Sequence, residues 1–239
     1  HGIGADSQSP DQSGIGMRRR GVSLSYRDAI LATPGLVGYW RLGERSGTVA
    51  RDEMGLNHGT YVASPTLGAA GLLAGDGDKA VTLNGTTQYV SVADADALDL
   101  GDVFSLSAWV GHPASASTYS LITKGVNAYQ MIVYVDVLYL GQSVELLASS
   151  GAVTLASGSR YYCVVTKDGA TRRVYLDGKD VTTLLANVVC LNTTAALIFG
   201  ARGNGTDQLL AGTIDEPAIW NRALTAAEIA DLYRIGKGY

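Results

Sequence analysis

The sequence predicts an all-β protein, built as a sandwich or a barrel and closed by a short C-terminal helix. About a dozen short runs of alternating apolar and polar residues recur at spacings of about 8–12 residues, with almost no helical periodicity between them. The chain also has 30 glycines and only 5 prolines, so most of its turns are glycine turns. Its 239 residues suffice for a sizeable core. With no second hydrophobic periodicity and no proline-rich break after residue 26, we expect one domain over residues 26–239.

The first 25 residues differ from this domain in composition. Residues 1–25 are polar and small, with almost no apolar side chain to anchor them. Such a composition predicts an extended arm. An arm of this kind is seldom ordered alone, so we expect a larger assembly or a homo-oligomer to contact it. The chain begins with His1, which leaves open whether residues 1–16 are a native leader, a processed end or added residues.

The elements of the N-terminal half follow in order. Residues 26–33 predict a short helical segment that Pro34 and Gly35 end. Alternation then predicts strands that are separated by one long loop over residues 43–59. The dipeptide Asn84-Gly85 between two of these strands is typical of a hairpin. These strands cover residues 37–42, 79–83, 88–92 and 103–110.

The C-terminal half reads as further short strands bounded by turn residues. The dipeptides Asp168-Gly169 and Asp177-Gly178 favour tight turns, because glycine accepts positive φ without strain. The predicted strands are 120–123, 129–135, 138–140, 144–147, 160–166, 173–176, 197–201 and 209–220.

The stretch 212–225 joins the last strand to the closing helix. Thr225 stands three residues before Glu228, which is the spacing of a capping box. Within the strand, Asp215 and Glu216 are adjacent carboxylates that are costly to bury without partners. Strict alternation would point their side chains to opposite faces. We expect Glu216 to be a buried structural acid near Arg222.

Charge and hydropathy exclude two classes of partner. The net charge of −4 argues against nucleic acid, which requires clustered lysine and arginine. No apolar run approaches the roughly 20 residues that span a membrane. The two cysteines, Cys163 and Cys190, lie in apolar runs and are expected to be buried; whether they form a disulfide stays open.

Six runs, taken together and in order, resemble the laminin-G-like, concanavalin A-like jelly-roll domains, a group that includes the pentraxins. The resemblance covers roughly residues 26–236 and implies two antiparallel sheets packed face to face. The N-terminal runs also resemble a version of the domain found in surface and phage structural proteins. Leu210, Pro217 and Asn84 depart from the family pattern, and Pro217 requires an edge or an irregularity in its strand. The six runs are Gly38–Leu42, Asp52–Gly59, Ala80–Gly85 with Tyr89 and Val90, Phe104–Val110, Tyr175–Gly178 and Gly212–Leu224.

The resemblance also implies one structural calcium ion, because similar domains often hold one beside the strand that precedes the terminal helix. Calcium binds six to eight oxygen ligands. Asp52, Asn57 and Asp215 match the implied positions, and Glu216 is a second carboxylate candidate. The alternative is that Asp52 and Asn57 only form turns and that Glu216 only pairs with Arg222.

Aromatic residues supply the candidate ligand site. Trp40, Trp109 and Trp220 lie inside alternating strands and are expected in the core. Tyrosines cluster in the middle strands, where jelly-roll binding modules form a concave sheet that suits a shallow carbohydrate groove; the alternative is the ordinary β-propensity of tyrosine. The candidates are Tyr119, Tyr129, Tyr134 and Tyr139.

Catalysis is not expected. Related glucanases place two carboxylates along one strand to face the scissile bond, and no strand here has that pattern. No nucleophile elbow is present either. We therefore expect a non-catalytic recognition or adhesion domain that binds a glycan or a protein surface and is carried at an extracellular or virion surface. The alternatives are a purely structural phage tail or capsid-decoration subunit anchored by its arm and, more remotely, a glycoside hydrolase-like enzyme.

Overall fold

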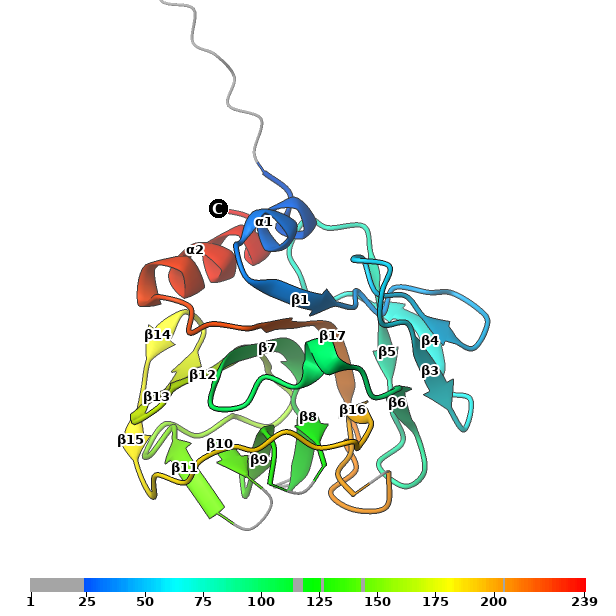
Figure 1. Cartoon of the computed structure of the whole chain (residues 1–239). Helices are drawn as coiled ribbons and strands as arrows, with labels where there is room; N and C mark the ends of the chain where they lie inside the picture. Colours follow the sequence, from blue (N-terminus) through cyan, green and yellow to red (C-terminus); the bar gives the residue numbers. More distant parts are fainter. Residues whose placement is uncertain (1–23, 114–117, 126, 143–144, 204) are drawn as a thin grey trace, which may run out of the picture.

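A computed structural model describes residues 24–113, 118–125, 127–142, 145–203 and 205–239. Within these ranges the chain forms two antiparallel sheets of eight and nine strands, packed face to face (Figure 1). The jelly-roll sandwich and its short C-terminal helix are therefore confirmed. The predicted arm lies outside the described residues except for Leu24 and Ser25, and Ser25 caps the first helix by accepting a hydrogen bond from the Asp28 amide.

The eight-stranded sheet has the order β14-β13-β12-β7-β17-β5-β4, and β1 also pairs with β17. It faces the second sheet on one side and the two helices on the other. Its strands are β1 (Leu36–Tyr39), β4 (Thr66–Ala70), β5 (Lys79–Thr82), β7 (Val103–Gly111), β12 (Arg160–Asp168), β13 (Thr171–Leu176), β14 (Lys179–Asp180) and β17 (Thr213–Trp220).

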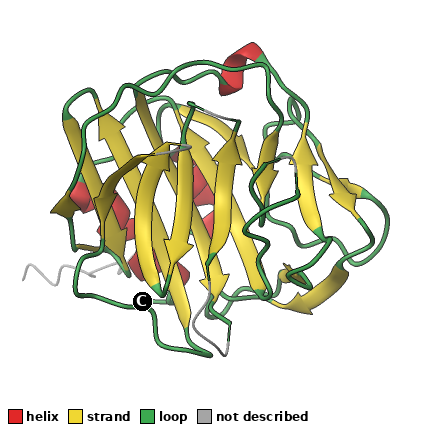
Figure 2. Ribbon diagram, turned by 90° about the horizontal axis from the view of Figure 1, so that it is seen from below, coloured by secondary structure: helices red, strands yellow, loops and turns green. Residues whose placement is uncertain are grey.

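The nine-stranded sheet has the order β15-β11-β10-β9-β8-β16-β6-β3-β2. Figure 2 views the molecule from the side of this sheet, with the long helices behind it. Its strands are β2 (Val49–Ala50), β3 (Gly59–Val62), β6 (Tyr89–Val92), β8 (Tyr119–Lys124), β9 (Gln130–Tyr134), β10 (Val137–Gln142), β11 (Glu145–Ser149), β15 (Thr183–Leu184) and β16 (Leu197–Phe199).

The helices cover the outer face of the eight-stranded sheet. α1 (Tyr26–Ala32) and α2 (Ala226–Gly236) lie side by side there (Figure 1). The predicted capping box opens α2, since Thr225 and Glu228 each accept a hydrogen bond from the other's backbone amide. A single 3-10 turn, η1 (Asp96–Leu98), lies in a loop. Among the described residues, no helix is long and apolar enough to cross a membrane.

Two apolar cores result from this three-layer arrangement. The larger core fills the space between the sheets and includes Trp40, while the smaller one lies under the helices and includes Trp109 and Trp220. All three tryptophans are wholly buried, as predicted. Both cysteines are buried and free.

The Asn84-Gly85 turn is not a hairpin. Asn84 does organise a turn, because its side-chain oxygen accepts hydrogen bonds from three following backbone amides. The strands on either side of it, however, belong to different sheets, β5 to the first and β6 to the second. The turn carries the chain across the sandwich, which local dipeptide chemistry does not distinguish from a hairpin.

Candidate functional site

A groove lies on the outer face of the nine-stranded sheet. It has a volume of about 190 Å³, and we call it the outer-face groove. Its lining combines three amide side chains, one acid, one arginine and an aromatic ring with two aliphatic side chains. The lining residues are Gln130, Ile132, Tyr134, Gln142, Glu145, Leu146, Arg202 and Gln208.

Strand alternation positions the floor of this groove. In β9, Met131 and Val133 belong to the core between the sheets, so Gln130, Ile132 and Tyr134 face outward. Gly141 in β10 is the direct partner of Gln130. A Cβ atom on Gly141 would lie 3.3 Å from Gln130 Cγ and 3.5 Å from Gln130 Nε2. The absence of a side chain at Gly141 therefore leaves room for the Gln130 side chain, which is itself buried in the floor of the groove.

The walls of the groove are held by hydrogen bonds. Gln142 Nε2 donates to the carbonyl oxygens of Asn127 and Val189, at 3.3 and 3.4 Å. Ser120 donates its backbone amide to the Gln208 carbonyl oxygen at 2.8 Å and its hydroxyl to Gln208 Oε1 at 3.0 Å. Because these bonds fix the polar groups in place, a ligand would meet a preformed site.

Tyr134 forms the lip of the groove at the end of the β9–β10 hairpin. Its side chain is half exposed, and the rings of Tyr134 and Tyr139 meet edge to face with centroids 6.4 Å apart. The two turn residues, Val135 and Asp136, both have positive φ. Asp136 Oδ1 lies 3.1 Å from His112 Nε2, which ties the turn to the sandwich.

The four predicted ligand-binding tyrosines divide into two pairs. Tyr134 and Tyr139 do lie on the outer face, and their contact with a ligand stays a prediction. The prediction that Tyr119 and Tyr129 contact a ligand is corrected, because both residues are buried in the core between the sheets. Their hydroxyls are occupied by His112 Nδ1, 2.6 Å away, and by the Leu98 carbonyl oxygen, 3.0 Å away. His112 is itself buried, and burial lowers its pKa.

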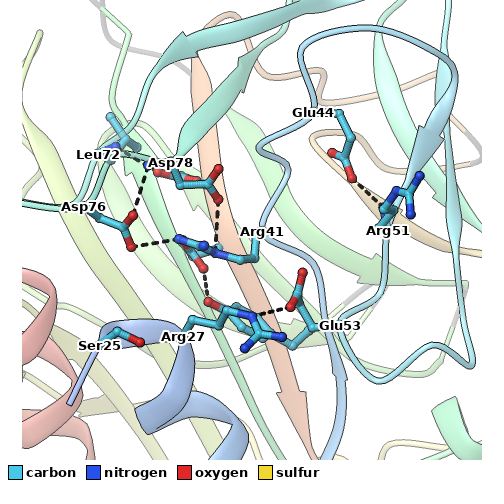
Figure 3. A network of polar contacts seen from close by, with 12 residues as sticks. Ser25, Arg27, Arg41, Glu44, Arg51, Glu53, Leu72, Asp76 and Asp78 are labelled. Atoms are coloured by element: carbon cyan, nitrogen blue, oxygen red, sulfur yellow. Dashed lines mark hydrogen bonds and ion pairs between the residues drawn. The ribbon is translucent and has the colours of Figure 1, made fainter.

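A second polar site surrounds Arg41, just after β1. Its guanidinium pairs with Asp76 at 2.7 Å, with Asp78 at 3.0 Å and with Glu216 at 2.9 Å. The side chains converge from β17, the loop before β5 and the end of β1 (Figure 3). Together with Asp215 we call these residues the acid cluster. Asp76, Asp78, Asp215 and Glu216 line one small cavity beside Gly71.

A bulge in β17 brings Asp215 and Glu216 to this same cavity. The pairing of β17 with β7 shifts register between Asp215 and Ala218, and Glu216 has a φ of +55°. The irregularity required by Pro217 is therefore present, but the expectation that alternation separates the two carboxylates is wrong. The predicted partner of Glu216 is also wrong, because Arg222 pairs with Glu228 instead, at 2.5 Å.

Burial changes the ionisation of both acids. Desolvation, together with the neighbouring Glu216, raises the pKa of Asp215 well above its usual range. Burial also raises the pKa of Glu216, although its bonds to Arg41 and to the Tyr39 hydroxyl oppose that rise. Asp215 Oδ2 accepts a hydrogen bond from the Leu72 amide at 2.8 Å. Asp215 Oδ1 is buried, and no hydrogen-bond partner for it occurs among the described residues.

The predicted calcium ligands are not brought together around one point. Asp52 Oδ1 accepts from the amides of Tyr39 and Met54, and Asp52 Oδ2 from those of Leu56 and Asn57. These four bonds use the lone pairs of the carboxylate, so Asp52 caps backbone rather than an ion. Asn57 is buried and accepts from Trp40 Nε1 through its backbone oxygen. Over the described ranges, no three His, Cys, Asp or Glu side chains are placed to hold a metal.

Sequence reasoning missed several residues of both sites. Arg41 follows the first strand without any distinguishing pattern. The run Gly75-Asp-Gly-Asp78 was a usable signal, since alternating glycine and aspartate suit a tight acidic loop. The odd spacing of two tyrosines along the strand was a second signal. Tyr129 and Tyr134 are five residues apart and must face opposite sides of a regular strand.

The two-sheet sandwich with its helix-covered outer face defines this chain as a jelly-roll domain. Residues 84–230, more than half of the chain, match the profile of the concanavalin A-like lectin/glucanases superfamily. The chain therefore belongs to this superfamily. A search of curated proteins with this sequence gives no match.

Several solved structures are similar in fold. Domain 4 of AbnA, an extracellular arabinanase from Geobacillus stearothermophilus solved with arabinotriose, has a TM-score of 0.62 and 21% identity, over 83% of this chain and 98% of that one. The sialidase of Trypanosoma rangeli, solved with sialic acid, has a TM-score of 0.63 and 18% identity, over 84% of this chain and 33% of the sialidase. The binding domain of Paraclostridial Mosquitocidal Protein 1 has a TM-score of 0.66 and 14% identity, over 84% and 52%. At these identities the likeness is one of fold.

Proposed function

We propose that this chain is a non-catalytic recognition domain that binds a glycan in the outer-face groove. The observation that carries the proposal is the lining of that groove. The amide groups can donate to and accept from sugar hydroxyls, the Arg202 guanidinium can donate to them, and the Tyr134 ring can pack against the apolar face of a sugar. The superfamily of lectins and glucanases, and a similar domain solved with arabinotriose, support the same ligand class.

The acids around the groove favour binding over hydrolysis. Glycosidases use two carboxyl groups that flank the scissile bond at a fixed separation. Among the described lining residues, Glu145 is the single carboxylate. In the acid cluster Asp76, Asp78 and Glu216 pair with Arg41 and Asp215 accepts from the Leu72 amide, and none of the four lines the groove. We therefore propose recognition rather than catalysis. An extracellular or virion surface as its location is a separate part of the proposal.

The test is a glycan array probed with the whole chain and with groove variants. Tyr134→Ala removes the lip, and Gly141→Val crowds both Gln130 and the Glu145 backbone oxygen, which would lie 3.3 Å from the added Cβ. Tyr134→Ala should weaken the array signals of glycans held in the groove while melting as the parent does, and Gly141→Val should weaken the same signals. Leu56→Ala, an exposed apolar residue in a distant loop, is the matched control and should bind normally. If no array signal weakens in either groove variant, this groove is excluded as the site.

A separate observation supports a second candidate function, a structural role in an assembly. The edge strand β15 and the loop after it expose Leu184, Leu185, Val189 and Leu191. Exposed apolar edges are sites where other chains add. In this second candidate function the chain is a subunit of a phage tail or capsid decoration that contacts its neighbours here and through the arm. Light scattering of the Leu184→Lys and Leu191→Lys double variant tests it: an oligomer should fall apart, whereas a parent that is already monomeric contradicts self-association.

Calcium binding is a further part of the proposal, now placed at the acid cluster. Asp215 Oδ1 supports it, since a buried carboxylate oxygen without a partner is a natural ligand for a hard cation. In the described structure Asp76, Asp78 and Glu216 pair with Arg41 and are not arranged around one point, so calcium binding would require some of these side chains to turn from Arg41 toward Asp215. The ion would supply positive charge that the single guanidinium of Arg41 does not provide for four carboxylates.

A further inference from the structure

A further hollow in the described part of the chain lies away from both sites discussed above. It has a volume of about 600 Å³ and lies where the β12–β13–β14 edge meets α2. We call it the rim cleft. It shares no lining residue with the outer-face groove. Its volume falls within the range of about 300–1,000 Å³ that is usual for small-ligand sites.

Three tyrosine rings from separate segments line the rim cleft. They are Tyr161 of β12, Tyr233 of α2 and Tyr239 beyond that helix. The Tyr161 hydroxyl accepts a hydrogen bond from the Ala156 amide at 2.8 Å. Tyr233 stacks on the buried Trp109 with centroids 5.9 Å apart and planes inclined by 17°. Two of the rings are therefore fixed before any ligand arrives, while Tyr239 is 71% exposed and available to close over one.

Two charged groups of opposite sign stand beside these rings. Asp177 and Lys179 both line the cleft, at the tight turn between β13 and β14. Asp177 Oδ1 accepts a hydrogen bond from the Tyr162 amide at 2.9 Å, which fixes the carboxylate. The Lys179 side chain is exposed. A carboxylate that accepts and an ammonium that donates can together hold neighbouring hydroxyl groups, and charged partners strengthen such bonds.

We infer that the rim cleft is a second saccharide-binding site, which takes a neutral oligosaccharide. Aromatic rings carry negative charge on their faces, so they attract the weakly positive C–H groups of a sugar ring. Asp177 and Lys179 would hold its hydroxyls, and their opposite charges favour a neutral sugar. The ligand class rests on the proposed glycan recognition, while the location is independent of it. Two sites on one chain would raise avidity for a polymeric glycan.

The inference is tested by NMR titration of the whole chain with arabinotriose and with each oligosaccharide that binds on the array. The cleft variant combines Tyr239→Ala with Lys179→Ala, because both side chains are exposed and their loss leaves the core intact. A milder variant, Asp177→Asn, keeps an oxygen for the Tyr162 amide but removes the charge. Tyr134→Ala serves as the matched variant of the outer-face groove.

The expected result is a neutral saccharide that shifts the backbone amides of Lys179 and Tyr239. Its affinity should fall about tenfold or more in the cleft variant and be unchanged in Tyr134→Ala. Binding lost only in Tyr134→Ala would overturn the second site and leave the proposed function standing. If a saccharide loses binding only in the cleft variant and others lose it only in Tyr134→Ala, both sites stand; if no saccharide depends on Tyr134, the second site stands and the groove is overturned. If only acidic saccharides shift these amides, the neutral ligand class is overturned. If no saccharide shifts them, the site itself is overturned.

Discussion

The hydroxyl of Tyr39 donates a hydrogen bond to the carboxylate of Glu216, at the residue where β17 bulges. The bond joins β1 to β17 at the point where β17 changes neighbours. The N-terminal half of β17 pairs with β5, and its C-terminal half pairs with β1. Non-glycine residues with positive φ are uncommon, so the strained backbone of Glu216 is held there by contacts of its own side chain.

The first prediction concerns the pH dependence of folding. Burial raises the pKa of Glu216 from 4.5 to about 7. Between these values the folded protein binds a proton that the unfolded chain has released, so this group makes the protein more stable as the pH falls from about 7 to 4.5. Glu216→Gln should flatten that slope, which for one proton reaches at most about 1.4 kcal/mol per pH unit. Urea unfolding at a series of pH values measures it.

Glu228 provides the matched control for this prediction. Its hydrogen bond from Arg222 lowers its pKa from 4.5 to about 2, the opposite direction. Its stabilising effect is therefore present above pH 4.5 and lost as the pH falls toward 2. Glu228→Gln should lower the stability by a constant amount above pH 4.5 and change the slope of the profile only below that pH. A Glu216→Gln profile parallel to that of the parent between pH 5 and 7 would contradict the assignment.

The second prediction concerns calcium. If the ion binds the acid cluster of the folded chain alone, calcium should raise the melting temperature and a chelator should reverse the rise. A hundredfold excess over the dissociation constant corresponds to about 2.7 kcal/mol. Asp215→Asn should erase the difference, because it removes the charge but keeps an acceptor for the Leu72 amide.

Asp52→Asn is the control for the calcium experiment. Asp52 accepts four backbone hydrogen bonds, so this change should lower the melting temperature equally with calcium and with chelator. A calcium effect that disappears in Asp52→Asn and persists in Asp215→Asn would place the ion at the sequence-predicted loop instead. Identical melting of the parent in both conditions would refute calcium binding.

The fold could be predicted largely from local patterns, because alternation, glycine turns and the capping box of Thr225 act over a few residues. The candidate sites could not, for two physical reasons. The bulge at Glu216 reverses the facing of every residue after it, so Trp220 lies under the helices while Ile214 faces the other sheet. Arg41 meets Asp76 and Glu216 only through tertiary packing, and the spacing of these residues along the chain does not indicate that they pair.

The third prediction concerns the capping box of α2. Thr225 accepts a hydrogen bond from the Glu228 amide through its side chain, and Glu228 accepts from the Thr225 amide at 2.8 Å. Thr225→Ala leaves one of the free amides of the first helical turn without its partner, and caps of this kind contribute about 1 kcal/mol. Thr225→Ser keeps the hydroxyl and should restore most of that stability. Chemical denaturation of the parent, Thr225→Ala and Thr225→Ser measures these differences in the free energy of unfolding. Equal stability of all three would rule out the cap as a contributor to stability.

The fourth prediction concerns Gly236, the last residue of α2. Glycine in a helix costs about 1 kcal/mol relative to alanine, so propensity alone favours Gly236→Ala. A Cβ atom there, however, would lie 2.5 Å from Cζ2 of Trp109. The Trp109 ring is wholly buried and packs against both Tyr162 and Tyr233, with ring centroids 5.1 and 5.9 Å away. It cannot yield without displacing both.

Overpacking of this kind costs about 1–3 kcal/mol, which exceeds the gain in helix propensity. Gly236→Ala should therefore lower the free energy of unfolding, and the near-ultraviolet circular dichroism of Trp109 should change with it. Gly77→Ala is the matched control, since nothing lies within 4 Å of its added Cβ. A Gly236→Ala protein as stable as the parent would show that α2 can shift away from the sheet, and the rim cleft beside Tyr233 would then be adjustable in width.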